Sequence, residues 1–318
     1  MEFITGRKMT NNILVIGDPI IDQHTWCKST RLSPEAVVPV CNFMRSEVIL
    51  GGAANVAKQV NVFANAYLTK INAIDDSVAE EAILAEEINI VRLPTIKTYV
   101  TPVKNRIWSN GQQICRLDNE IEDPLFDMED YNLWISLVKR SIVGNDIKLV
   151  IFSDYDKGLL CDYMIEDIAL YCKSLGVITI LDPKRPTYYR IKGLTIVKPN
   201  LKEAKETGLS FQEISAKMTD TCVMVTQGAN GMSLYFNEDN LFNVGGVTVD
   251  VADPCGCGDT AVSVLGYALS NLSGLSGITT AILTKALRMA NFAASRAAQH
   301  HGNYILSNVE LLNVEGMA

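Results

Sequence analysis

The chain has 318 residues, 48% of them hydrophobic and 20% charged, which is typical of a globular protein with a large buried core. Its formal net charge of −8 argues against general binding to nucleic acid or to anionic membranes, so an anionic substrate would need a local basic patch. No stretch approaches the ~20 apolar residues of a membrane span, and the N-terminus lacks the apolar core of a signal peptide. Residues 1–12 are expected to form a flexible extension.

The eight cysteines predict free thiols in a reducing compartment, the cytoplasm, because they are scattered and no secretion signal accompanies them. Only Cys255 and Cys257 lie close together in the sequence. A zinc site is not expected there, since the chain has no second cysteine pair and its histidines lie far away in sequence. A disulfide between the two is not expected either, because the short separation strains the bond.

The first half of the chain predicts a buried sheet and a second, exposed one. In chain order, the elements expected in the buried part are strand 12–17, helix 51–64, strand 66–74, helix 75–87 and strand 88–91. Residues 25–49 alternate loosely and contain several prolines, and residues 98–116 alternate around a Ser-Asn-Gly turn at 109–111. These two segments favour a small exposed sheet, with the second segment forming a hairpin.

From residue 130 onward, apolar strands alternate with helices. The expected order is helix 131–143, strand 148–153, helix 163–175, strand 177–182, strand 194–198, helices 201–207 and 211–217, strand 222–226, hairpin 233–249, and helices 260–271 and 279–299. Such alternation predicts an α/β fold in which a parallel sheet is covered by helices on both faces. Ligands of these sheets bind beyond the carboxyl ends of the strands.

Polar groups suited to binding or catalysis follow the end of nearly every predicted strand. They are Asp18, Asp22, Asp154, Lys157, Asp182, Lys184, Asn200, Glu203, the segment Thr226-Gln-Gly228, and Asp259. A single polar residue in such a place is usually a turn former. Their recurrence at successive strand ends favours a shared site at one edge of the sheet.

The run Asp253-Pro-Cys-Gly-Cys-Gly-Asp-Thr260 is the most informative of these segments, because it precedes an apolar helix. Gly256 and Gly258 allow a tight turn, and the free N–H groups of the first helical turn would face an anion. Asp259 would repel a bound phosphate, so its carboxylate makes better sense as a general base for an attacking hydroxyl. The alternative is an aspartate that caps the helix after a glycine-rich turn.

Over nearly its full length the chain resembles the ribokinase-like (PfkB) carbohydrate kinases. The motifs that carry the resemblance are Gly51-Gly52-x-x-Asn55, Asn200-x-x-Glu203, Thr226-x-Gly228-x-x-Gly231 and Gly256-x-Gly258-Asp259. Within this family the chain is most similar to kinase domains that act on D-glycero-D-manno-heptose 7-phosphate, a precursor of bacterial lipopolysaccharide. The stretches behind that closer resemblance are 17–22, 33–39, 51–57, 112–118, 153–158, 182–184 and 198–203.

The resemblance implies a three-layer αβα sandwich over residues 13–318, with a central, mostly parallel sheet and a small β-sheet lid drawn from about 22–49 and 98–118. It also implies a cytoplasmic kinase that uses ATP and Mg²⁺ to phosphorylate the anomeric hydroxyl of a small sugar phosphate, and a homodimer formed through the lid. Two other possibilities stay open. One is a related kinase for another sugar, sugar phosphate or nucleoside, and the other is a sensor without catalytic activity on the same fold.

The resemblance also implies roles for individual residues. Asp259 would be the base, with the backbone N–H groups of Gly256, Cys257 and Gly258 forming the anion hole. The nucleotide would contact Lys198, Thr226, Gly228 and Gly231, and Asn200 and Glu203 would hold Mg²⁺ through water. The sugar phosphate would contact Asp22, Gly51, Gly52, Asn55, Asp154, Lys157 and Lys184, with Lys104, Arg106 and Arg116 around its distal phosphate.

Alternatives remain for some of these residues. Gly51 and Gly52 suit close packing between helix and strand as well as a sugar site, and the basic residues suit a solvated hairpin face. The chain also departs from the family pattern, with Pro254, Cys255 and Cys257 in the glycine loop and Asp156 in place of a glycine. Because the anion hole uses backbone N–H groups, a cysteine at 257 is compatible with activity.

Overall fold

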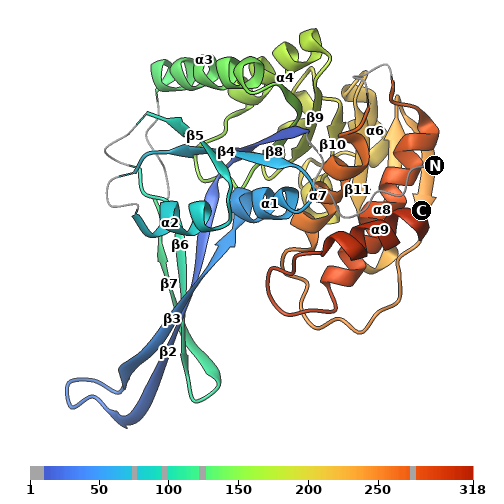
Figure 1. The fold of residues 1–318 in the computed structure, drawn as a ribbon. Helices are drawn as coiled ribbons and strands as arrows, with labels where there is room; N and C mark the ends of the chain where they lie inside the picture. Colours follow the sequence, from blue (N-terminus) through green and yellow to red (C-terminus); the bar gives the residue numbers. More distant parts are fainter. Residues whose placement is uncertain (1–10, 74–76, 95–98, 122–126, 273–276, 318) are drawn as a thin grey trace.

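The computed structural model describes residues 11–73, 77–94, 99–121, 127–272 and 277–317 (Figure 1). Most of the predicted extension, residues 1–10, lies outside these ranges. A nine-stranded sheet forms the centre, in the order β13-β12-β11-β10-β9-β8-β1-β4-β5. Its strands are β1 (Asn12–Gly17), β4 (Asn65–Ile71), β5 (Asn89–Leu93), β8 (Ile147–Ser153), β9 (Ile178–Asp182), β10 (Ile196–Val197), β11 (Cys222–Thr226), β12 (Met232–Phe236) and β13 (Asp239–Val244).

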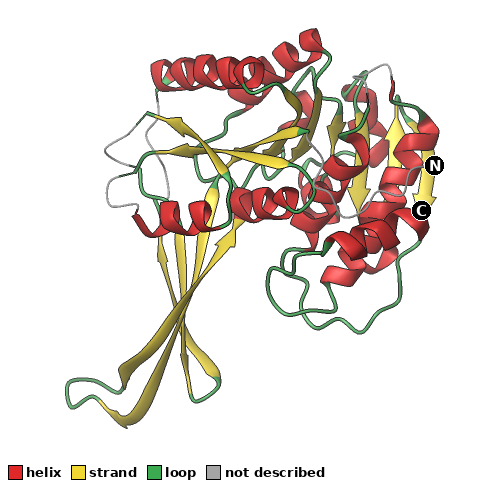
Figure 2. Cartoon of the chain, viewed as in Figure 1, coloured by secondary structure: helices red, strands yellow, loops and turns green. Residues whose placement is uncertain are grey.

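The first seven strands of this sheet in chain order pair in parallel, and β12 and β13 are antiparallel at one edge. Helices cover both faces (Figure 2). They are α1 (Gly52–Asn61), α2 (Ser77–Ala85), α3 (Met128–Gly144), α4 (Asp162–Leu175), α5 (Leu201–Glu206), α6 (Phe211–Lys217), α7 (Cys257–Leu269), α8 (Thr280–Ala297) and α9 (Asn308–Met317). The fold class predicted from the sequence is confirmed.

The apolar run of β1 shows why a strand inside this sandwich is hydrophobic on both sides. Ile13 and Val15 belong to a core that includes α1, α2, α7, α8 and α9. Leu14 and Ile16 belong to a second core, formed with α3, α4, α5 and α6. Successive side chains of a strand point to opposite faces, so a strand covered on both sides has no polar face.

A second sheet of four strands projects from the body of the molecule as a long, twisted blade (Figure 1). It consists of β2 (Pro19–Leu32), β3 (Pro39–Gly51), β6 (Val103–Ser109) and β7 (Gln112–Asn119), in the order β3-β2-β6-β7. Two antiparallel hairpins are joined by a parallel pairing of β2 with β6. We call this sheet the lid.

Three details differ from the sequence-based expectation. Helix α7 begins at Cys257, three residues earlier than predicted, so Asp259 lies inside its first turn. Residues 245–249, expected in a hairpin, continue from β13 as a loop. Helix α9 was not predicted, although Ser307 and Glu310 accept hydrogen bonds from each other's backbone N–H groups in a capping box.

Among the helices within the described ranges, none has both the length and the apolar character that crossing a membrane requires.

Candidate active site

The mouth of α7 is the centre of the site. Gly256 has a φ of +73°, a left-handed conformation that favours glycine, and it turns the chain into the helix. A side chain added at Gly258 would place its Cβ 3.9 Å from Nζ of Lys198, which directly follows β10. The free N–H groups of the first turn of α7 therefore lie at the carboxyl edge of the central sheet, next to a buried cation.

Asp259 is 7% exposed and lies at this mouth. Its Oδ2 accepts a hydrogen bond from the amide of Asn55 at 2.7 Å, and its Oδ1 accepts one from the phenol of Tyr155 at 2.5 Å. Burial raises the pKa of Asp259 to about 6, while the two hydrogen bonds act in the opposite direction. The carboxylate is therefore largely ionised at neutral pH but basic enough to accept a proton.

Three charged side chains, Asp182, Lys198 and Glu203, are grouped at the ends of β9 and β10 and at the start of α5. Lys198 is 2% exposed, and its Nζ lies 2.9 Å from Oδ1 of Asp182 at the end of β9. Burial raises the pKa of Glu203 to about 7, and the nearby charge of Asp182 adds to this rise. Asp182 and Glu203 are among the strand-end residues named from the sequence, whereas Lys198 was expected near the nucleotide only from the family resemblance.

Asn200 and Glu203 form a capping box at the start of α5. The Asn200 side chain accepts from the N–H of Glu203 at 2.9 Å, and the Glu203 carboxylate accepts from the N–H of Asn200 at 2.8 Å. The second oxygen of Glu203, Oε1, makes no hydrogen bond to the described residues. Within the described ranges, no three His, Cys, Asp or Glu side chains are grouped to hold a metal ion directly. Mg²⁺ usually keeps several waters and takes one or two carboxylates, so this donor set fits a hydrated ion.

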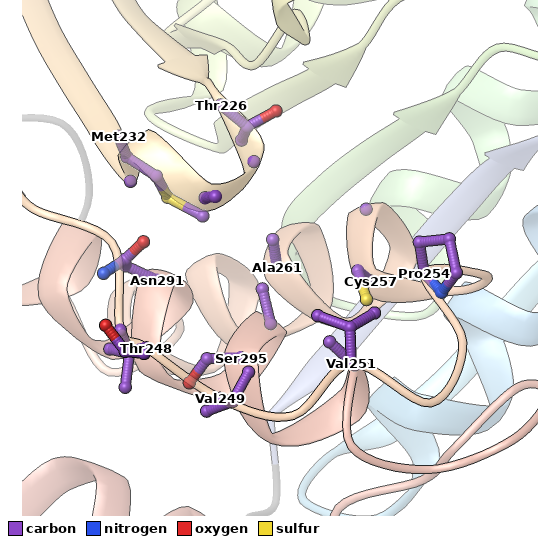
Figure 3. A pocket seen from close by; sticks show the side chains of 17 residues that line it. Thr226, Met232, Thr248, Val249, Val251, Pro254, Cys257, Ala261, Asn291 and Ser295 are labelled. Atoms are coloured by element: carbon purple, nitrogen blue, oxygen red, sulfur yellow. The ribbon is translucent and has the colours of Figure 1, made fainter.

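A largely apolar cavity of about 400 Å³ opens beside the mouth of α7 (Figure 3). Thr226 and Met232 lie on one side of it, Asn291 and Ser295 of α8 lie on the other, and Cys257 marks the end where α7 begins. Its remaining lining residues are Gly228, Ala229, Gly231, Val247, Thr248, Val249, Val251, Pro254, Gly258, Ala261, Ala294 and Ala298. An apolar slot that ends at an anion-binding helix mouth suits a nucleotide, with its base in the slot and its phosphates at α7.

The two loop thiols lie at the edge of this site. Burial raises the pKa of Cys257 to about 11, and a hydrogen bond with Asp253 raises the pKa of Cys255. Both thiols are therefore protonated at neutral pH, and a protonated thiol is a poor nucleophile and metal ligand. The charges of Arg106 and Asp22 also act on the pKa of the Cys255 thiol, in opposite directions.

The lid places its basic residues on one face. Arg106 lies opposite Arg116 on β7, and Lys104 lies opposite Asp22 on β2. Arg106 Nη1 is 2.5 Å from Oδ1 of Asp22, and Arg116 makes two hydrogen bonds of 2.8 Å to Asp118. Each guanidinium is therefore held by a carboxylate in the structure.

The glycines at the base of the lid have packing roles that the sequence left open. A Cβ at Gly52, which has a φ of +55°, would lie 2.5 Å from the carbonyl oxygen of Asp18. A Cβ at Gly51 would lie 2.6 Å from Oδ2 of Asp22. The backbone oxygen and the positive φ therefore require glycine at Gly52, whereas at Gly51 the nearest atom is the end of the Asp22 side chain, for which glycine leaves room.

Two predicted sugar contacts, Asp154 and Lys157, have other partners in the structure. Asp154 is 6% exposed, and its oxygens accept from the N–H of Asp156 and from Arg185. Lys157 pairs with Glu120 at 2.8 Å. Since the oxygens of Asp154 are engaged in holding its own loop, the structure gives no support to a sugar contact by this residue.

Lys184 and Asn55, two other predicted sugar contacts, keep side-chain polar atoms available to a ligand. Lys184 is exposed; burial raises the pKa of the Asp182 and Glu203 carboxyls, and the charge of Lys184 acts in the opposite direction on both. Asn55 is fully buried and donates to Asp259, while its Oδ1 has no hydrogen-bond partner among the described residues. Asn55 therefore contacts Asp259, the candidate base, directly, and its Oδ1 remains as an acceptor without a partner among the described residues.

Sequence reasoning missed Tyr155 as a site residue. It belongs to the segment Ser153–Gly158, which carries part of the family resemblance, but its contact with Asp259 spans 104 positions of sequence. The sequence signal for Tyr155 was therefore a family motif, residues 153–158, in which this residue had no assigned role. The pocket wall at 247–251 was missed as well, because these residues alternate like a strand.

The fold and this arrangement define a phosphotransferase with a ribokinase-like fold. Arabidopsis thaliana ribokinase complexed with ribose and ATP has a TM-score of 0.66 at 16% identity, over 98% of this chain and 100% of that one. Phosphofructokinase-2 from Escherichia coli in complex with potassium has a TM-score of 0.70 at 14% identity, over 97% and 99%. At such identities the likeness shows the fold alone.

The family follows from the sequence comparison. Residues 10–309 match the model described as pfkB family carbohydrate kinase, so the chain belongs to this family and is an ATP-dependent sugar kinase acting on a small molecule. A relative from Campylobacter jejuni, named bifunctional protein HldE, is 30% identical over 332 residues, covering 100% of this chain and 67% of that protein. HldE from Desulfatibacillum aliphaticivorans is 31% identical, covering 94% and 62%. The chain thus spans about two thirds of the length of these relatives.

Proposed function

We propose that this sugar kinase phosphorylates the anomeric hydroxyl of D-glycero-D-manno-heptose 7-phosphate, giving the 1,7-bisphosphate in the synthesis of a lipopolysaccharide precursor. The single observation that carries the proposal is the pair of guanidinium groups, Arg106 and Arg116, which lie opposite each other on one face of the lid. A neutral sugar gives no reason for such a pair, whereas a phosphate monoester matches the fork of an arginine. The similarity to proteins named HldE is consistent with this choice.

In the proposed reaction, the anomeric hydroxyl gives its proton to Asp259 while its oxygen attacks the γ-phosphorus of ATP. The bond from the γ-phosphorus to the bridging oxygen breaks, and ADP leaves. The N–H groups at the mouth of α7 stabilise the charge on the transferred group, and the buried ammonium of Lys198 adds to this effect. Asn55 and Tyr155 each donate a hydrogen bond to the Asp259 carboxylate.

Asn200 and Glu203 are the residues that would hold Mg²⁺ through water. When bound, the ion neutralises charge on the nucleotide phosphates. The buried Glu203 carboxyl, whose pKa is raised, is a group that a nearby cation would keep ionised. Its free Oε1 can accept from a metal-bound water without breaking the capping box.

A second copy of the chain is the partner that we propose for the lid. Its strands expose large apolar side chains that a monomeric sheet would leave in water, including Phe43 (69% exposed), Met44 (64%) and Leu117 (59%). Pairing lids would cover them and protect the exposed strand edges. Sedimentation analysis at micromolar concentration is the check, and a monomer there would contradict the proposal.

The substrate is tested by measuring ADP release from the wild-type protein with heptose 7-phosphate and with unphosphorylated heptose. A charge-assisted hydrogen bond contributes roughly 1.5–3 kcal/mol, so kcat/KM should favour the phosphorylated sugar by about 10- to 150-fold. Equal kcat/KM values for the two sugars would contradict the proposed substrate and favour a related kinase for another sugar, sugar phosphate or nucleoside. ADP release with none of a panel of sugars, despite ATP binding, would support a sensor instead.

A further inference from the structure

The hydrogen bond between Tyr155 and Asp259 is the observation behind a further role. Tyr155 donates to Oδ1 at 2.5 Å, and Asn55 donates to Oδ2 at 2.7 Å, so each oxygen of the carboxylate has one fixed donor. A carboxylate accepts about four hydrogen bonds in its own plane. Two donors on different oxygens therefore fix that plane and leave further acceptor positions free.

The loop that carries Tyr155 is fixed by hydrogen bonds to Asp18 and Tyr131, which lie outside it. Asp18, fully buried after β1, accepts hydrogen bonds from the N–H groups of Tyr155 at 3.3 Å, Lys157 at 3.1 Å and Leu159 at 3.0 Å. The phenol of Tyr131 donates to the carbonyl of Gly158 at 2.9 Å. Such a network leaves the loop little freedom, so the position of the Tyr155 hydroxyl is set by the fold.

The protonation states of the two groups are compatible with a lasting donor and acceptor. Burial, together with the neighbouring Asp259, raises the pKa of Tyr155 well above its ordinary value. The phenol therefore stays protonated and donates, and it does not compete with the carboxylate as a base. The hydrogen bond in turn lowers the pKa of Asp259 and so opposes the effect of burial.

We propose that Tyr155 is a positioning residue for proton abstraction: its hydroxyl orients the carboxylate of Asp259 toward the mouth of α7. This inference rests on the proposed role of Asp259 as the base. A group that merely packs beside the carboxylate would affect stability but not the acidity of the base. A group that hydrogen-bonds the ionised form affects both the orientation and the acidity of the base, and this difference makes the two roles separable.

The test compares Tyr155→Phe with Tyr131→Phe over a range of pH. Tyr131→Phe is the matched control, because it removes a phenol that holds the same loop through Gly158 but has no hydrogen bond to Asp259. For Tyr155→Phe we expect kcat to fall roughly 10- to 100-fold with little change in KM for ATP. The acid limb of kcat/KM should move up by roughly one pH unit. Tyr131→Phe should leave this limb in place.

An unmoved acid limb in Tyr155→Phe, or the same movement in both variants, would overturn the proposal. A second measurement does not need turnover: carbon-13 NMR of the aspartate carboxyls, with Asp259→Asn to assign the signal, gives the pKa of Asp259 directly. Tyr155→Phe should raise it, and an unchanged pKa would refute the inference. If the wild-type protein transfers no phosphate to any sugar, the proposed function fails, whereas the NMR result still decides whether Tyr155 sets the state of Asp259.

Discussion

Asn200 and Glu203 each accept a hydrogen bond from the backbone N–H of the other, at 2.9 and 2.8 Å. The family resemblance assigned this pair to the metal, and the structure shows that it also begins α5. The two roles are compatible because the capping box uses only one oxygen of Glu203. The box fixes the direction of the carboxylate, and Oε1 remains for a metal-bound water.

Glu203→Gln separates these roles. The glutamine oxygen can still accept from the N–H of Asn200, so the helix start is preserved while the negative charge is lost. We expect the Mg²⁺ concentration for half-maximal activity to rise roughly 10-fold, since an uncharged oxygen attracts the hydrated ion less. Titration of Mg²⁺ at saturating ATP measures this change.

The control is Glu213→Gln. Glu213 forms the same capping box with Ser210 at the start of α6, but it is exposed on the surface. This variant should leave the Mg²⁺ midpoint unchanged. A shift of equal size in both variants, or a raised sugar KM without any shift in Glu203→Gln, would assign Glu203 to another task.

Asp259→Asn should lower kcat by ~10²–10⁴ and leave nucleotide binding nearly intact, because an amide cannot accept the proton. In the wild type, kcat/KM should fall as the pH drops below about 6, where the base becomes protonated. Steady-state kinetics and isothermal titration with ATP measure the two effects. More than a tenth of the wild-type kcat in the variant would contradict the role of Asp259 as base.

The same substitution has a consequence for stability. The folded protein holds the pKa of Asp259 at about 6, above its ordinary 3.8, so the folded state binds this proton more tightly than the unfolded state. The wild type therefore loses unfolding free energy as the pH rises from about 4 to about 6, and Asp259→Asn does not share this loss. Relative to wild type, the variant should gain up to about 3 kcal/mol between pH 4 and pH 7. Urea unfolding at both pH values measures the difference.

The sequence predicts the sandwich because its signals are local: buried strands are apolar throughout, and α7 follows a glycine-rich turn. It also predicts that Asp182, Glu203 and Asp259 lie at one edge, since parallel strands end on the same side of a sheet. The contact of Tyr155 with Asp259 could not be predicted in this way. It depends on the shape of a loop that is fixed by Asp18, a buried carboxylate whose partners are three backbone N–H groups.

Asp156 illustrates a further limit of prediction from the sequence. The family pattern has a glycine at this position, and the structure shows why, because the residue has a φ of +57°. Aspartate is one of the few other residues that adopt this conformation at modest cost. The aspartate is therefore compatible with the left-handed backbone at this position, which the sequence by itself did not reveal.

The basic face of the lid gives the last prediction. If Arg106 and Arg116 bind the distal phosphate, alanine at either position should lower kcat/KM for heptose 7-phosphate by about 10- to 150-fold. Activity on unphosphorylated heptose and KM for ATP should change little. Arg106→Ala should be the more harmful of the two, because it leaves Asp22, 2.5 Å away in the wild type, as an unpaired negative charge facing the substrate.

Arg45→Ala is the matched control for the lid. Arg45 lies on β3 with its guanidinium 3.5 Å above the ring of Trp26, further out along the blade than the pairing of Asp22 with Ile49. Its loss removes one positive charge from the same sheet without touching Arg106 or Arg116. The three variants are compared with both sugars in the ADP-release assay. An equal loss of kcat/KM for heptose 7-phosphate in all three variants would show that only the net charge of the lid matters. If Arg106→Ala and Arg116→Ala lose no activity, these side chains only form a solvated face of the hairpin.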